Sequence, residues 1–332
     1  MRAAPGHVPL LATTRGPLAE CVHYGTIAVC DLDRGLVHAV GDVQALNFAR
    51  SALKPLQALP FIEDDGPGRF GFGSHEVALM CASHSGEAVH VRIVQRMLAR
   101  IGARETDLQC GCHAPLYFSA TGKPAPARSS FGVLHHNCSG KHAGFLAYCR
   151  LHGHGLTDYL APESALQVRI RNTVQQFAGT ARIESGIDGC SAPNFALPLS
   201  QLALAYARLA AGQSAALQAV RFAMMRHPDL VSGTARTDLA LAQTGAGDWL
   251  AKSGADGVQA IGVRSRDLGI AVRIADGNAR ALHAVTAEVL HQIGLLAKPA
   301  DSALARYFRP SLTNYRGQTT GSLQPLFELG RT

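Results

Sequence analysis

Segments typical of β-strands lie near the two ends of this 332-residue chain, with a long, largely helical stretch between them. Residues 20–29 and 35–41 alternate in polarity and are rich in β-branched residues, and the Asp and Gly residues between them are typical of a hairpin turn. Three further strands are expected over 249–254, 258–263 and 268–274. Consecutive strands joined by tight turns pair antiparallel. The two ends are therefore expected to build one antiparallel five-stranded sheet.

The middle of the chain carries apolar residues at helical spacing, interrupted by Gly, Pro and capping residues. We expect loops over 61–75 and 104–132, the second of a length that often forms a lid. Helices are expected over about 51–60, 87–101, 139–151, 157–179, 199–211, 214–226, 235–243 and 279–296.

Together these elements predict a mixed α/β (α+β) fold in which helices flank the sheet. A single domain over 1–332 is expected, with a sheet lobe formed by 1–50 plus 245–332 and an inserted, mainly helical lobe over 51–244. The cleft between two such lobes is the default position for a binding site.

Composition excludes several classes of protein. No run of about 18 apolar residues is present, so no membrane span is expected. Residues 1–20 lack the continuous apolar core of a signal peptide, and eight cysteines at this length fit reduced thiols, so a cytoplasmic location is expected. The net charge is +7, but the basic residues are scattered without interleaved aromatics, so nucleic acid is not an expected partner.

The choice between lysine and arginine points to particular positions. Only five of the 31 basic residues are lysines: Lys54, Lys123, Lys141, Lys252 and Lys298. Lysine, unlike arginine, can lose its proton within reach of neutral pH. Three of the five lysines stand in motifs that are notable on other grounds.

The first motif is Ser51-Ala-Leu-Lys54. On a helix the two polar side chains lie on one face, one turn apart. A lysine so placed can accept the serine proton, provided that burial or a second cation keeps the amine neutral. The alternative is an ordinary helix start, with serine as the cap and lysine in solvent.

Two further motifs carry charged or nucleophilic groups. Residues 136–144 open a helix with one lysine and one histidine near free backbone N–H groups, which is a natural carboxylate site. Asp188 is the carboxylate of a turn-like stretch over 185–195. From spacing alone, Cys138, Lys141 and the distant Cys190 form an unusual metal-ligand set, because lysine must arrive neutral.

Ser51-x-x-Lys54, Ser83-His84-Ser85 and Lys252-Ser253-Gly254 resemble, in order, the three motifs of the penicillin-recognising serine hydrolases. The second motif of that group ends in Asn, whereas this chain has Ser85. The predicted layout is also similar to theirs.

A closer resemblance covers nearly the whole chain. Four blocks resemble the signatures of the Rhizobium-type (class 3, asparaginase II family) L-asparaginases: Arg50-Ser51-Ala-Leu-Lys54-Pro55, Cys81-Ala-Ser83-His84-Ser85-Gly86-Glu87, Asn137-Cys138-Ser139-Gly140-Lys141-His142-Ala143-Gly144 and Asp188-Gly189-Cys190-Ser191-Ala192-Pro193-Asn194. The resemblance implies a serine β-lactamase/penicillin-binding-protein-like fold, hydrolysis of L-asparagine to L-aspartate and ammonia, and a homodimer.

Position by position, the resemblance implies two Ser–Lys pairs, Ser51 with Lys54 and Ser83 with Lys252. It also implies a zinc ion (Zn²⁺) that aids substrate binding more than the chemistry. Its ligands would be Cys138, Lys141 and Cys190.

Amide hydrolysis needs a nucleophile, a base and anchors for the substrate. We hypothesise that Ser51 attacks the side-chain amide carbon with Lys54 as its base, that Ser83 relays the proton to the leaving ammonia, and that water then releases aspartate from the acyl-enzyme. Clustering of Lys54 with Lys252 would lower the pKa of both amines.

The expected substrate anchors are Asp188 for the ammonium group and Arg50 or His142 for the carboxylate. Each has a structural alternative. Asp188 could belong to a plain turn, Arg50 to a surface ion pair, and His142 to a buried hydrogen-bond network.

Other functions fit the same motifs. A glutaminase would act on a side chain one methylene longer, which a pocket distinguishes by only about 1–3 kcal/mol. A β-lactamase or peptidase is a second enzyme alternative. The non-enzyme alternative is a sensor of an amino acid or of peptidoglycan on the same scaffold, which would need neither Lys54 nor Lys252.

Overall fold

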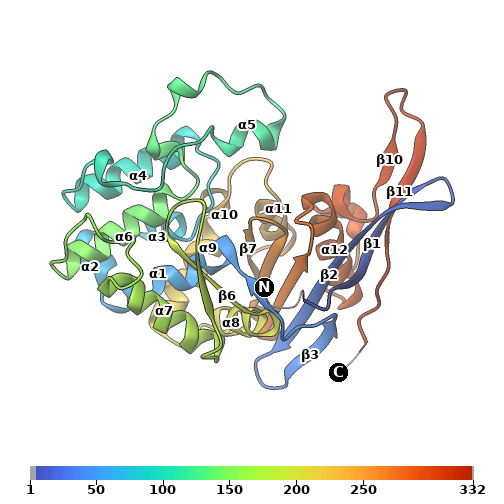
Figure 1. Cartoon of the computed structure of the whole chain (residues 1–332), viewed down its shortest axis with the longest axis horizontal. Coiled ribbons are helices and arrows are strands. Elements are labelled where there is room, and N and C mark those ends of the chain that lie inside the picture. Colours follow the sequence, from blue (N-terminus) through green and yellow to red (C-terminus); the bar gives the residue numbers. More distant parts are fainter. Residues whose placement is uncertain (1–4, 331–332) are drawn as a thin grey trace.

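The computed structural model describes residues 5–330 and shows an eight-stranded main sheet with a lobe of helices beside it (Figure 1). The strands follow the order β10-β11-β1-β2-β9-β8-β7, and β3 pairs with β2 off this path. All of the pairings are antiparallel. The strands are β1 Val8–Arg15, β2 Leu18–Asp31, β3 Gly35–Val40, β7 Trp249–Gly254, β8 Val258–Val263, β9 Leu268–Ile274, β10 Ser311–Thr313 and β11 Thr319–Pro325.

The predicted number of five strands is wrong, although all five predicted segments are strands of the main sheet. The three additional strands are β1, β10 and β11. Strand β1 begins with a proline-containing apolar stretch, and β10 and β11 are mostly polar and partly exposed. Strands β1 and β11 pair with each other across the whole length of the chain, as Leu11 does with Pro325, and β10 is added to the sheet through β11. Local patterns do not report such pairing.

Most helices of the middle segment match the predicted ranges, but α7 begins at Ala165 and not near residue 157, and α3 and α10 lie outside the predicted ranges. Residues 61–75, predicted as a loop, contain the end of α1 and all of α2, and residues 104–132 contain η2, α5 and η3. The α-helices are α1 Lys54–Glu63, α2 Gly66–Phe70, α3 Ser74–Met80, α4 Ala88–Arg100, α5 Leu116–Thr121, α6 Ser139–Leu151, α7 Ala165–Ala178, α8 Leu199–Ala211, α9 Ala215–Arg226, α10 Pro228–Val231, α11 Thr237–Thr244 and α12 Ala279–Gln292. The 3₁₀ helices are η1 Arg50–Leu53, η2 Glu105–Asp107, η3 Arg128–Ser130, η4 Val133–His135, η5 Arg264–Arg266, η6 Pro299–Asp301 and η7 Ala305–Tyr307.

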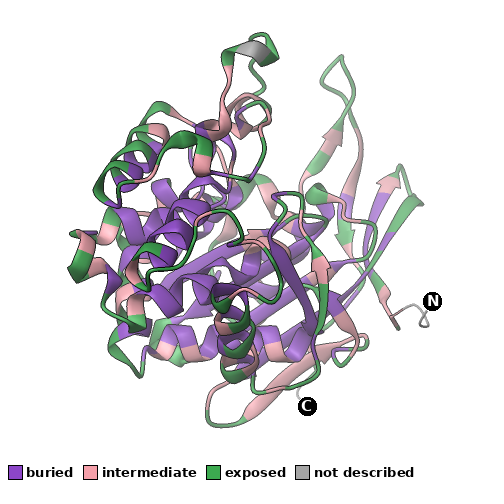
Figure 2. Cartoon of the chain, turned by 60° about the vertical axis from the view of Figure 1, so that its left-hand side comes forward, coloured by how far each residue is buried: buried purple, intermediate pink, exposed green. Residues whose placement is uncertain are grey.

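The two faces of the main sheet carry residues of different size. Helix α8 crosses one face, where small side chains allow close approach; a Cβ on Gly269 would lie 1.8 Å from the Ala203 carbonyl oxygen. Helix α12 packs on β9, β1 and β11 against larger side chains. The buried residues of the two faces belong to separate clusters, with Ala28, Ala260 and Ala271 in one and Ile27, Ile261 and Ile270 in the other. Figure 2 shows buried residues along both the sheet strands and the inner helices.

A small second sheet joins two distant parts of the chain. Strand β4 (Leu46–Phe48) pairs with β6 (Pro193–Pro198), which pairs with β5 (Glu184–Ile187). Strand β4 leads directly into η1 and α1, and the turn between β5 and β6 carries residues 188–192. The Ser51 segment and the Asp188 turn are thereby held side by side.

The predicted lobe bounds 1–50 and 245–332 include residues 1–4 and 331–332, which lie outside the described residues. Among residues 5–330, no helix combines the length and the apolar character that a membrane crossing requires.

Candidate active site

Ser51 stands in η1, directly after a residue with an unusual backbone. Arg50 has φ of 51°, the left-handed region that L-residues rarely adopt. The backbone at Arg50 also lies close to the end of β7, because a Cβ on Gly254 would meet the Ala49 carbonyl oxygen at 2.5 Å. Pro55 lies in the first turn of α1, where proline is tolerated because its missing N–H has no helical partner to lose. This backbone brings the Ser51 segment against the strand that carries Lys252.

Lys54 is buried and bonds to the other predicted serine. Its Nζ donates to the Ala82 carbonyl oxygen at 2.5 Å, to Ser83 Oγ at 3.0 Å and to the Asn137 carbonyl oxygen at 3.5 Å. Ser83 is buried too, whereas Ser51 is partly exposed. The structure therefore brings Lys54 to Ser83, where the resemblance implied a pair with Ser51.

Lys252, on β7, has no exposed side-chain surface. Its Nζ donates to the Ser253 carbonyl oxygen at 2.6 Å and lies 3.5 Å from Asp238 Oδ2. Burial, chiefly, lowers the pKa of Lys252 to about 8, with Asp238 opposing the shift and Lys54 adding to it. The two lysines thus lie within electrostatic reach of each other, and Lys252 has a pKa suited to proton transfer near neutral pH.

Cys138, Lys141 and Cys190 also come together. Cys138 caps α6, Lys141 lies in its first turn, and Cys190 lies in the β5–β6 turn. Lys141 Nζ is 3.0 Å from Cys190 Sγ, and all three side chains are buried. Hydrogen bonding to Cys190, with help from the nearby lysines, holds the pKa of Cys138 well below its usual range despite burial. Burial acts against the charge of Lys141, but Cys190 and Cys138 raise its pKa overall.

The donor set of this cluster fits a zinc ion. Thiolates are preferred zinc ligands, and the ammonium–thiolate pair could exchange its proton for a metal ion. Between residues 5 and 330, no three His, Cys, Asp or Glu side chains are grouped to hold a metal, so the fit depends on Lys141 as a ligand.

His142 follows the same helix turn and is fully buried. Its Nδ1 shares a hydrogen bond of 2.8 Å with the Tyr159 hydroxyl, and burial lowers its pKa to about 4. Its Nε2, on the side of Cys190, has no hydrogen-bond partner of good geometry among the described residues. His142 is therefore neutral at physiological pH and can offer a substrate one hydrogen bond but no charge.

Arg50 and Asp188 form a partly buried ion pair. Arg50 Nε and Nη2 lie 2.9 and 2.8 Å from Asp188 Oδ1, and Nη1 contacts the exposed Asp256. Burial acts against the charge of Asp188, but Arg50 and the Gly189 N–H lower its pKa overall. A guanidinium beside a carboxylate matches the two charged groups of a free amino acid.

Sequence reasoning missed Asp238, which lies in the first turn of α11 and is 3% exposed. Its carboxylate accepts hydrogen bonds from Ser253 and Gln259 and faces Lys252. The available signal was a single acidic residue at the start of an otherwise apolar helix.

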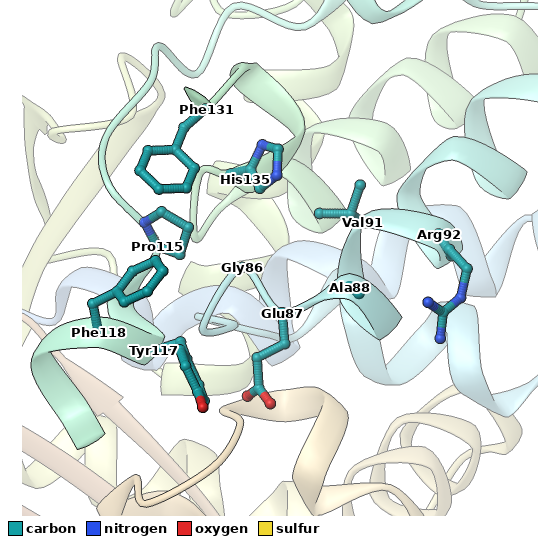
Figure 3. A pocket seen from close by; sticks show the side chains of 10 residues that line it. All are labelled: Gly86, Glu87, Ala88, Val91, Arg92, Pro115, Tyr117, Phe118, Phe131 and His135. Carbon is teal, nitrogen blue, oxygen red and sulfur yellow. The ribbon is translucent and has the colours of Figure 1, made fainter. Parts of the chain in front are cut away.

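A pocket of about 530 Å³ lies apart from this cluster and shares no residue with it. Figure 3 shows it between the start of α4 and the segment that carries α5 and His135. Its wall adjoins the Ser83–Gly86 segment, since the Ser85 carbonyl oxygen accepts from the Tyr117 N–H. The lining residues are mostly apolar or aromatic: Gly86, Glu87, Ala88, Val91, Arg92, Pro115, Tyr117, Phe118, Phe131 and His135.

Comparison with known proteins gives one match over nearly the full length. The family model described as L-asparaginase II matches residues 11–325. No curated protein shows a significant match.

Solved structures give weaker matches. Mglu in its native form is 17% identical, with 81% of this chain and 63% of that chain covered and a TM-score of 0.45. A beta-lactamase from Mycobacterium bovis is 15% identical, with 81% and 94% covered and a TM-score of 0.36. The chain spans less than two thirds of the length of the Mglu chain. At these TM-scores the resemblances carry no conclusion about activity.

Proposed function

The chain belongs to the L-asparaginase II family, and on that basis we propose that it hydrolyses the side-chain amide of L-asparagine to L-aspartate and ammonia. The observation that carries the proposal is the buried contact of 3.0 Å between Lys54 Nζ and Ser83 Oγ, with Lys252 close by. Burying an amine costs folding free energy, and proton transfer in catalysis gives a reason for two buried amines near a hydroxyl that ligand binding alone does not.

Ser51 is the proposed nucleophile, because it is the partly exposed serine of the two. Its Oγ attacks the amide carbon, and its proton passes to the neutral form of the Lys54 amine, one turn along. Ser83, which accepts a hydrogen bond from Lys54, relays a proton to the departing amine, which leaves as ammonia. Lys252 is the second amine of the site and the base of the Ser83 pair. Water then attacks the aspartyl ester on Ser51 and releases aspartate.

Asp188 and Arg50 support recognition of the amino-acid end of the substrate. The substrate ammonium would take the place of Arg50 beside Asp188, and the substrate carboxylate would bind the freed guanidinium. His142 is a neutral hydrogen-bonding neighbour in this arrangement.

The test is release of ammonia from L-asparagine and from L-glutamine by the wild type and three variants. Ser51→Ala should abolish turnover, since a positioned nucleophile and its proton transfer account for at least about 10²–10⁴-fold in rate. Ser83→Ala should slow turnover without an aspartyl adduct accumulating on Ser51, because the proposed role of Ser83 precedes the acyl-enzyme; mass spectrometry checks for the adduct. Ser214→Ala removes the N-cap of α9, away from the cluster, and should leave turnover unchanged.

A loss smaller than about tenfold for Ser51→Ala would remove it as nucleophile. An adduct on Ser83 in the Ser51→Ala protein would exchange the two roles. Faster release from L-glutamine would make the protein a glutaminase, and hydrolysis of nitrocefin would favour the β-lactamase alternative.

Cys138, Lys141 and Cys190 are the proposed zinc ligands. When bound, zinc would supply a Lewis-acidic contact for the substrate. Protein purified without chelator is expected to contain zinc, and Cys138→Ala or Cys190→Ala should lose it. Cys149→Ala changes a buried cysteine on the same helix and should retain the metal. Metal-free wild-type protein with intact Cys138 and Cys190 would contradict the proposal.

A further inference from the structure

Asp238 contacts the Lys252 segment at several points. Its Oδ2 accepts from the Ser253 N–H at 2.9 Å and from Ser253 Oγ at 2.8 Å, and lies 3.5 Å from Lys252 Nζ. Its Oδ1 accepts from Gln259 Nε2 at 3.0 Å. We propose that Asp238 is the positioning residue of Lys252, which it holds in place and keeps basic enough for proton transfer. This inference rests on the proposed function, in which Lys252 is the second amine of the site.

The route of positioning runs through Ser253. The Lys252 amine donates to the Ser253 carbonyl oxygen at 2.6 Å, and the same residue donates its N–H and hydroxyl to Asp238. Gln259 lies opposite Ser253 in the β7–β8 ladder, so the carboxylate is tied to both strands. A carboxylate with these contacts has little freedom, and the amine that depends on it is fixed relative to the sheet.

Several charged or titratable groups face this pair. Lys54 from α1, Arg236 before α11, Cys138 at the start of α6 and Cys81 after α3 face Lys252. Asp238 also faces Tyr206 of α8, His283 of α12 and Arg236. Of all these groups Asp238 is the only carboxylate. It therefore opposes the effect of burial and of two neighbouring cations on the Lys252 amine.

The consequence has a definite sign. Without the Asp238 charge, the pKa of Lys252 falls further below its ordinary value. The amine then loses its proton at lower pH and is a weaker base. The acid limb of the profile of kcat/KM against pH should shift to lower pH, while the plateau rate falls.

The experiment measures kcat and KM for ammonia release from L-asparagine between about pH 6 and pH 10, with thermal unfolding of each protein. Asp238→Asn should shift the acid limb down by at least about half a pH unit and lower kcat by at least about tenfold, with KM within about twofold. Asp238→Glu keeps the charge and should return the acid limb to the wild-type position.

A matched control is available at Asp248, the residue directly before β7. Asp248 accepts from the Ser265 N–H and hydroxyl, both at 2.8 Å, in the same way that Asp238 accepts from Ser253. Asp248→Asn should leave both the acid limb and kcat unchanged. Lys252→Met tests the premise, because activity close to that of the wild type would remove Lys252 from the reaction and so contradict the proposed function.

If Lys252→Met is inactive but Asp238→Asn keeps the wild-type acid limb, the inference about Asp238 is wrong while the proposed function stands. If Asp238→Asn does not fold, Ser253→Ala decides. It retains the carboxylate and should lower kcat by about fivefold or more without changing KM. A kcat within about twofold of the wild type for Ser253→Ala would contradict the positioning route.

Discussion

At the scale of single residues, Arg50 carries two constraints at once. Its backbone is left-handed, and its guanidinium is shared between a mostly buried Asp188 and an exposed Asp256. An arginine whose partner can change is suited to capture of a carboxylate, because its fork of N–H donors is already oriented. The Asp188 contact is then the one that a substrate ammonium would replace.

We therefore expect Arg50→Gln to act on substrate binding more than on chemistry. Loss of one charge-assisted contact should raise KM for L-asparagine about 10–100-fold with kcat within about threefold. Steady-state kinetics at a fixed pH measure both. Asp256→Ala removes the exposed partner alone, 67% exposed, and should change KM by less than about twofold. Equal effects of the two variants would mean that Arg50 is a surface ion pair without a role in binding.

At the scale of elements, the position of Cys138 and Lys141 at the start of α6 depends on how closely α6 approaches α3. A Cβ on Gly140 would lie 2.4 Å from the Leu79 carbonyl oxygen, a backbone atom that cannot move aside. One turn later, a Cβ on Gly144 would meet the flexible side chain of Met80. The first turn of α6, which carries Lys141, is therefore set by a glycine.

Gly140→Ala is expected to destabilise the protein by about 1–3 kcal/mol and to lower zinc content and turnover together, because the start of α6 must shift. Gly144→Ala should have a smaller effect, since Met80 can change rotamer. Gly155→Ala, at an exposed position with open space, is the control and should stay within about 0.5 kcal/mol. Urea unfolding measures all three, and equal stability of the Gly140 and Gly155 variants would contradict this account.

The elements also show what the sequence could predict. Helices α6 and α8 and strands β7 to β9 occupy the predicted residues, because caps, Gly turns and apolar period are local signals. Strands β1 and β11 pair with each other across the length of the chain, β10 pairs with β11 at the edge of the sheet, and all three were missed. The candidate site follows the same division. The predicted residues come together, but the Lys54–Ser83 contact and Asp238 depend on how distant elements dock.

At the scale of the whole molecule, the main sheet packs against a different layer of helices on each of its two faces. Small residues face α8 and the helical lobe, and large β-branched residues face α12. Burial also holds several histidines neutral, three in the helical lobe and one on α12. Burial, chiefly, lowers the pKa of His84, His90, His136 and His283, the last to about 4.

These histidines make global stability depend on pH. Their ordinary pKa is 6.5, so as the pH falls below that value the unfolded chain binds protons that the folded chain cannot. Stability is unaffected by them above about pH 7 and is lost between pH 6.5 and about pH 4, by up to about 1.4 kcal/mol per pH unit for each histidine.

His283→Gln removes one of these titrating side chains without touching the zinc ligands. Its loss of unfolding free energy between pH 7 and pH 5 should be about 1–2 kcal/mol smaller than that of the wild type. His154→Gln changes an exposed histidine and should follow the wild type. Urea unfolding at pH 7, pH 6 and pH 5 measures the three slopes. Parallel slopes for wild type and His283→Gln would show that the acid sensitivity of the molecule has another origin.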